Sequence, residues 1–208
     1  MLDKVKVLYH ASIVLHDNIY IDPYKIENET HNAKYIFVTH SHYDHLSIED
    51  IEKVRNEDTI FFLTPDGKEK LLDIGVSEKR IVCVAPNEIY KFGKIEVNVI
   101  AAYNVDKEYH PKENNWVGYL IKIQGVSYYI MGDTDQNEDN ENIKCDVLFV
   151  PIGGTYTMDY KQAAEYTNLI KPKYVIPIHY NSIVGKKEDS DKFAKLLDHR
   201  IQCFVYLS

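Results

Sequence analysis

Short apolar runs alternate with polar segments along the chain, and most of these runs are rich in Val, Ile, Tyr and Phe. Such runs are typical of β-strands rather than helices. Between them, Asp17-Asn18 and Gln124-Gly125 predict two-residue hairpin turns. The predicted strands are Lys4–Leu8, Ser12–Leu15, Asn18–Asp22, Tyr35–Thr39, Ile60–Thr64, Ile81–Val84, Ile95–Ala101, Tyr119–Gln124, Val126–Met131, Val147–Pro151, Tyr174–Ile178 and Cys203–Leu207.

Helical signals are fewer than strand signals. Ser47 followed by Asp50 resembles a capping box ahead of an apolar helical face. Asp159 can cap a second helix, which Lys171-Pro172 should end because proline cannot continue a helix. The other predicted helices are Asp66–Leu72 and Asp189–His199.

The order of these elements favours an α/β fold. Predicted strands outnumber predicted helices about three to one and several are consecutive, which excludes a simple alternation of strand and helix. We therefore predict two sheets packed face to face with helices outside. A length of 208 residues suits one domain with a large core, so a single domain over residues 1–208 is expected.

The formal net charge of -8 argues against a nucleic-acid or anionic-membrane partner, because either would normally require a basic excess. The first residues include an acid and no long apolar run, so we predict neither a signal peptide nor membrane insertion. Cys83, Cys145 and Cys203 lack metal-pair spacing and lie in or beside apolar runs, which predicts buried thiols. A cytoplasmic location and a small-molecule substrate are expected, whereas the oligomeric state is not predicted.

The most informative segment is the apolar strand that ends at Thr39 and is followed by three imidazoles and a carboxylate. His40 and His42 are two residues apart, so in an extended segment they point the same way and can hold one ion. Asp44 and His45 follow where the chain turns into a predicted helix. Imidazole and carboxylate donors suit zinc, manganese or iron. A surface histidine cluster, the plainer alternative, would lack the preceding strand and the interspersed acid.

Three later strands also end at polar groups. Asn104 follows one of them, Asp133 another and His179 a third. If these strand ends converge on one rim, they form a pocket with rigid walls and metal-binding side chains.

Together these motifs resemble the metallo-β-lactamase superfamily. The shared features are the H-x-H-x-D-H run, the Gly-Asp-Thr after a strand and the late strand-His. Tyr9-His10-Ala-Ser and Ile21-Asp22-Pro23 are similar to the branch that contains ascorbate-phosphate lactonases and N-acylphosphatidylethanolamine phospholipases D. The resemblance implies an αβ/βα sandwich of two mixed β-sheets flanked by helices, with the site at one edge.

The resemblance also implies two divalent transition metal ions, with zinc preferred over manganese or iron. A hydroxide shared by the ions would be the nucleophile, and Asp44 would be the catalytic residue that orients it or receives its proton. The implied ligands are His40 and His42 on the first metal, Asp44, His45 and His179 on the second, and Asp133 on both.

One position departs from the family pattern. Asn104 stands where the third histidine of the first metal is expected, and neutral amide oxygen is a weak ligand for zinc. Either His110, six residues further on, replaces that histidine, or the first metal is loosely held or absent.

Three further residues are candidates for substrate contact or for support of the ligands. His10 precedes Ala-Ser near the expected metals, or is a core histidine. Asp22 can hydrogen-bond a ligand histidine, or simply end a strand. Tyr180 follows His179 directly and is expected to reach the substrate. Gly153-Gly154 is either an oxyanion-binding turn or a turn that needs glycine.

These features predict hydrolysis of a small or amphiphilic ester, lactone or phosphodiester. The fold cannot select among these substrates, because one scaffold hosts many reactions. The alternatives are a nuclease of the same superfamily, which the negative charge disfavours, and a non-catalytic metal-binding or regulatory protein with a degraded first metal site.

Overall fold

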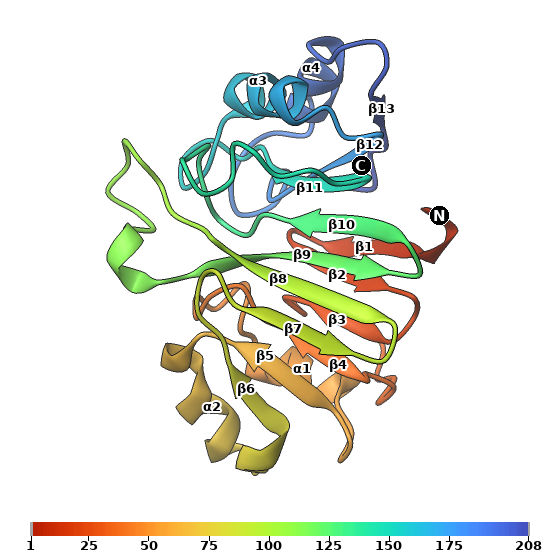
Figure 1. Ribbon diagram of the computed structural model, residues 1–208, viewed down its shortest axis with the longest axis vertical. Coiled ribbons are helices and arrows are strands. Elements are labelled where there is room, and N and C mark those ends of the chain that lie inside the picture. The colour runs from red at the N-terminus through yellow and green to blue at the C-terminus, as the bar shows by residue number, and fades with distance from the viewer. Residues whose placement is uncertain (1, 208) are drawn as a thin grey trace. The chain divides into compact units, whose positions relative to one another are not determined.

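The computed structural model describes residues 2–207. The chain divides into two compact units, unit 1 from Met1 to Val84 and unit 2 from Ala85 to Ser208. Each unit contains one β-sheet and its own helices (Figure 1). The single domain remains a prediction from chain length.

Unit 1 contains a six-stranded mixed sheet in the order β1-β2-β3-β4-β5-β6. The first three strands are antiparallel hairpin partners, and the pairs from β3 to β6 are parallel. The strands are β1 (Val5–Tyr9), β2 (Ser12–Leu15), β3 (Ile19–Ile21), β4 (Tyr35–Phe37), β5 (Ile60–Leu63) and β6 (Ile81–Cys83).

Two α-helices of unit 1 follow strand ends, α1 (Ile48–Val54) and α2 (Lys68–Asp73). The N-cap of α1 is Ser47, whose hydroxyl accepts the N–H of Asp50, as predicted. Both helices bury apolar residues in the core cluster that also contains residues of β4 and β5. Short 3-10 helices occupy Leu2–Lys4, Pro65–Gly67 and Glu78–Arg80.

Unit 2 contains a seven-stranded mixed sheet in the order β13-β12-β11-β10-β9-β8-β7. The pairs from β7 to β10 are antiparallel, and the pairs from β10 to β13 are parallel. The strands are β7 (Ile89–Phe92), β8 (Ile95–Ala101), β9 (Val117–Ile123), β10 (Val126–Ile130), β11 (Val147–Pro151), β12 (Tyr174–Ile178) and β13 (Gln202–Cys203).

The helices of unit 2 are α3 (Tyr160–Ile170) and α4 (Asp189–Lys195), with a 3-10 helix at Lys112–Asn114. Figure 1 shows α3 and α4 together on one side of unit 2, beside β11 and β12. Their buried residues share one core cluster with residues of β10 to β12. Two mixed sheets flanked by helices thus confirm the predicted α/β fold class. Among residues 2–207, every helix is too short or too polar to cross a bilayer.

Some local predictions were wrong for identifiable reasons. The turn after β2 contains three residues, because Leu15 pairs with Ile19, and two of the three have positive φ. Strand β7 was not predicted, since its exposed edge position leaves it without a clear apolar face. The three cysteines were predicted to be buried, but Cys83 is exposed and Cys145 and Cys203 are partly exposed. The Gln124-Gly125 turn is confirmed, with φ values of 53° and 87°.

The cap of α3 generates a stability prediction. Asp159 accepts the backbone N–H of Lys161 and Gln162, and the Gln162 side chain accepts the N–H of Asp159. Asp159→Ala should lower the free energy of unfolding by about 1 kcal/mol, measured by urea denaturation. Asp159→Asn, which keeps an acceptor oxygen, should lose much less. Equal losses in the two variants would contradict a role for the cap.

Candidate metal centre

The segment after β4 places two imidazoles side by side in unit 1. Nε2 of His40 lies 3.1 Å from Nδ1 of His42. Nδ1 of His40 faces the hydroxyl of Thr39 at 3.0 Å. Because that hydroxyl donates to Asp22 at 2.7 Å, its oxygen can accept a hydrogen bond from His40. This contact leaves Nε2 of His40 beside His42, while the binding of one ion by the pair stays a prediction.

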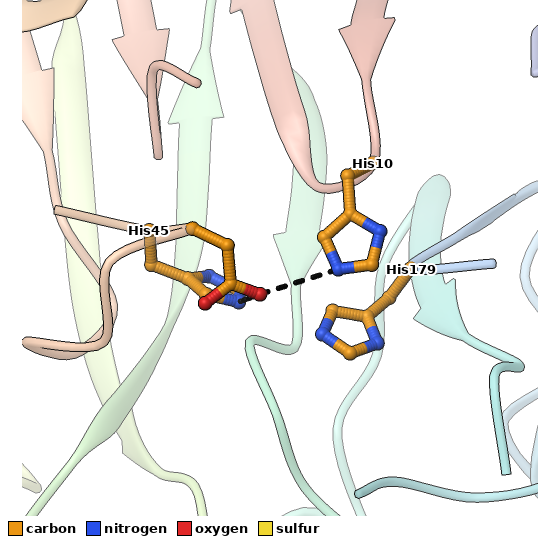
Figure 2. Close-up of side chains that lie close together, drawn as sticks. His10, His45 and His179 are labelled. Carbon is orange, nitrogen blue, oxygen red and sulfur yellow. Dashed lines mark ion pairs between the residues drawn. The ribbon is translucent and has the colours of Figure 1, made fainter. Parts of the chain in front are cut away.

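A carboxylate lies close to two imidazoles in the same unit. Oδ2 of Asp44 is 3.4 Å from Nε2 of His10 and 3.6 Å from Nε2 of His45. Figure 2 shows His10 and His45, with a dashed line for the ion pair of His10. All three side chains are buried, and their donor atoms lie within 4.8 Å of one another. This geometry suits a shared cation, because carboxylate and imidazole are both zinc ligands.

Asp22 holds His45 in its orientation. Its Oδ2 accepts Nδ1–H of His45 at 2.8 Å, and its Oδ1 accepts the N–H of Thr39 at 2.8 Å. Burial raises the pKa of the Asp22 carboxyl, while the hydrogen bonds from His45 and Thr39 favour its ionised form. With Nδ1 engaged, His45 presents Nε2 toward Asp44. A carboxylate behind a histidine commonly fixes the tautomer of a metal ligand.

Unit 2 contains a second carboxylate between two imidazoles. Asp133 follows β10, after a turn that includes Gly132 at a φ of 67°. Its Oδ2 lies 3.3 Å from Nε2 of His110 and 3.0 Å from Nε2 of His179. All three residues are buried. Each unit therefore holds one carboxylate oxygen next to two Nε2 atoms.

Asn104 organises the loop that carries His110. The Asn104 amide nitrogen donates to the carbonyls of Tyr109 and Tyr156, both at 2.8 Å, and its backbone N–H donates to the His110 carbonyl at 2.9 Å. The loop thereby returns His110 to Asp133, and the His110 ring packs edge-on against Trp116 with centroids 5.3 Å apart. These contacts make Asn104 a support for the loop that carries His110, whereas the role of His110 as a substitute ligand stays a prediction.

Gly153 is required by a close approach of two backbones. A Cβ at this position would overlap the carbonyl oxygen of His179 and lie 2.6 Å from Val184 Cγ2. His179 itself bends the chain at the end of β12, with a φ of 57°. Glycine therefore lets the backbone at residue 153 lie against His179. Of the two roles that the sequence left open, an oxyanion-binding turn or a turn that needs glycine, this contact favours the second for Gly153.

The structure groups most of the sequence-predicted residues within each unit. Tyr180 is an exception, because its hydroxyl donates to the Leu207 carbonyl at 2.9 Å; its substrate role stays a prediction. Thr39 was missed, although a hydroxyl residue between the strand and the first histidine was a usable signal. The grouped residues are His10, Asp22, His40, His42, Asp44 and His45 in unit 1, and Asn104, His110, Asp133 and His179 in unit 2.

The donor chemistry fits a borderline transition metal. The grouped side chains offer imidazole nitrogen and carboxylate oxygen, whereas calcium and magnesium sites are built from oxygen donors. Hydrogen bonds hold the rings of His40 and His45. His10, His110 and His179 lie at backbone bends with positive φ. The fold itself therefore positions these imidazoles.

Comparisons with known proteins agree with this chemistry. A family model described as a beta-lactamase superfamily domain matches residues 4–179. A UPF0173 metal-dependent hydrolase from Saccharolobus solfataricus is 32% identical over 95% of this chain and 92% of its own length. One from Pyrococcus furiosus is 29% identical over 97% of this chain and 95% of its own length. A crystal structure from Parabacteroides distasonis shares the fold with a TM-score of 0.80 at 24% identity, covering 98% of this chain and 93% of that one.

The support of His179 can be tested at Gly153. Gly153→Ala should displace the His179 backbone and weaken metal binding by about tenfold. A loss of this size is usual when the contacts that orient a metal ligand are disturbed. A zinc titration against a competing chelator measures this, with circular dichroism as the check on folding. A folded variant that binds zinc as tightly as the wild type would contradict the requirement for glycine.

The roles of Asn104 and His110 can be separated by substitution. His110→Ala should weaken the binding of one zinc equivalent by at least about tenfold. Asn104→Asp should weaken it too, because a carboxylate cannot donate to the Tyr109 and Tyr156 carbonyls. If Asn104 were itself the ligand, Asn104→Asp would instead tighten the site and His110→Ala would change nothing. Zinc titration of both variants beside the wild type decides between these outcomes.

Proposed function

Because this chain belongs to the metallo-β-lactamase superfamily, as a metal-dependent hydrolase of the UPF0173 family, we propose that it cleaves an ester-type bond in a small or amphiphilic molecule. The bond would be a carboxylic ester, a lactone or a phosphodiester. The observation that carries the proposal is the buried carboxylate next to two imidazoles in each unit. The Tyr9-His10-Ala-Ser and Ile21-Asp22-Pro23 segments, which resemble the lactonase and phospholipase branch, support the bond class.

We assign the metal ligands as a proposal for two divalent transition metal ions, with zinc preferred over manganese or iron. When bound, such ions polarise the substrate and lower the pKa of coordinated water, so hydroxide is available near neutral pH. The proposed ligands are His40, His42, Asp44 and His45 of unit 1 and His110, Asp133 and His179 of unit 2.

The side chains of unit 1 have separate duties in this proposal. Asp44 orients the attacking water and accepts its proton at Oδ2. Nε2 of His10 faces that oxygen at a distance of 3.4 Å and helps to hold the carboxylate in place. Asp22 fixes His45 through Nδ1, and its three hydrogen bonds compensate for its complete burial.

A panel of esters, lactones and phosphodiesters identifies the bond class. Purified protein is assayed with added zinc, manganese or iron, and again after chelation. Turnover of one class that disappears with chelator and returns with metal supports the proposal. Failure of every class under all metal conditions would refute ester-type hydrolysis.

Asp133 provides the most direct test by substitution. Asp133→Asn keeps the shape of the side chain but removes the negative charge that faces His110 and His179. We expect kcat/KM for the substrate found in the panel to fall by more than about 100-fold. This loss exceeds the one that is usual when a residue that only supports a metal ligand is removed. The matched control is Asp106→Asn, an exposed acid of the same unit, which should retain wild-type activity. A fully active Asp133→Asn enzyme would rule out the proposed ligand role.

A further inference from the structure

Three tyrosines of unit 1 form a ring cluster: Tyr9, Tyr24 and Tyr43. The Tyr24 ring lies edge-on to the other two, with centroids 5.8 Å from Tyr9 and 6.0 Å from Tyr43. Edge-to-face contacts at this distance are the favoured arrangement for aromatic pairs. The three rings therefore form one continuous aromatic surface rather than separate side chains.

The ring cluster adjoins the proposed ligands through the chain itself. Tyr9 immediately precedes His10, and Tyr43 stands between His42 and Asp44. Yet Tyr43 is 64% exposed and Tyr9 36% exposed. An aromatic surface left exposed beside polar catalytic groups is a common feature of ligand-binding sites.

The backbone under Tyr24 is fixed by buried acceptors. The Tyr24 N–H donates to the Ser12 hydroxyl at 3.3 Å. The next two N–H groups, of Lys25 and Ile26, donate to the two oxygens of Asp50, both at 2.9 Å. Asp50 is buried on α1, whose N-cap is at Ser47. The central ring is thus held in place before any ligand arrives, which lowers the entropic cost of binding.

A cavity of about 360 Å³ is lined by Tyr9, Tyr24 and the segment from Lys25 to Glu27, with further residues of α1. Its charges do not favour an anion. Lys53 is engaged by Glu49 at 3.1 Å and by Asp50 at 3.0 Å. Lys25 lies over the Tyr24 ring, 5.5 Å from the centroid. Three acids and two lysines line the cavity, so neither a phosphate nor a carboxylate is the expected occupant.

We propose that the ring cluster binds an uncharged aromatic group of the substrate and so sets the specificity of the enzyme. The inference rests on the proposed hydrolysis and names the part of the substrate that lies against unit 1. Ring-on-ring contact supplies the attraction, with Tyr9 and Tyr24 in the wall of the cavity and the exposed Tyr43 ring against Tyr24 outside its lining.

The test compares two esters that share a leaving group, methyl phenylacetate and methyl propionate. Removing the exposed ring in Tyr43→Ser should lower the ratio of their kcat/KM values by about three- to tenfold. Tyr43→Phe keeps the ring and should keep the ratio, which excludes an effect through the neighbouring ligands. Tyr206→Ser is the matched control, because Tyr206 is exposed to the same extent as Tyr9 and lies outside the ring cluster. An unchanged ratio in Tyr43→Ser overturns the inference.

Direct binding separates this inference from the proposed function. Phenylacetamide, an uncharged aromatic probe, is titrated into metal-loaded protein and followed by saturation-transfer NMR, which needs no turnover. Binding that weakens by about three- to tenfold in Tyr43→Ser, and not in Tyr43→Phe or Tyr206→Ser, supports the ring cluster even if neither ester is hydrolysed. No binding to the wild type, or equal binding to all four proteins, overturns it.

Discussion

A carboxylate oxygen next to two imidazole nitrogens occurs in both units, and much of the surrounding structure serves to keep it there. Asp44 and Asp133 are buried, and a buried charge is costly unless it is compensated by nearby donors or cations. Two Nε2 atoms lie within 3.6 Å of each carboxylate oxygen. Apolar side chains at these buried positions would give a more stable fold than these polar groups do. The strands supply the rigid supports, and each of the four histidines reaches its carboxylate from a separate strand end, turn or loop.

The loop from Asn104 to His110 is held by contacts that both residues make. The Asn104 amide nitrogen donates to two backbone carbonyls and faces Nδ1 of His110 at 3.5 Å. The imidazole comes from His110, where Trp116 packs against it. Under the proposed ligand set, His110 would bind the metal and Asn104, six positions earlier, would support the loop.

Sequence alone predicted the fold class because its strands are short, apolar and bounded by clear turn signals. It also marked the polar residues at the strand ends as candidates, because the ends of parallel strands lie at one edge of a sheet, whereas their assignment to individual metals stays a prediction. It could not choose between Asn104 and His110, since that choice depends on where a loop returns. Nor could it find the close approach at Gly153 or the contact between Tyr9 and Tyr24, because both depend on tertiary packing.

Four of the residues at the candidate centre share an unusual backbone conformation. His10, Asp22, His110 and His179 have φ values of 50°, 45°, 58° and 57°, in the left-handed region that costs most residues roughly 1–2 kcal/mol. Each bend turns the side chain away from the direction that a regular strand would give it. A designer who wished to transplant these donors into another protein would therefore have to copy the bends as well as the side chains. Regular strands carrying the same four residues would point them elsewhere.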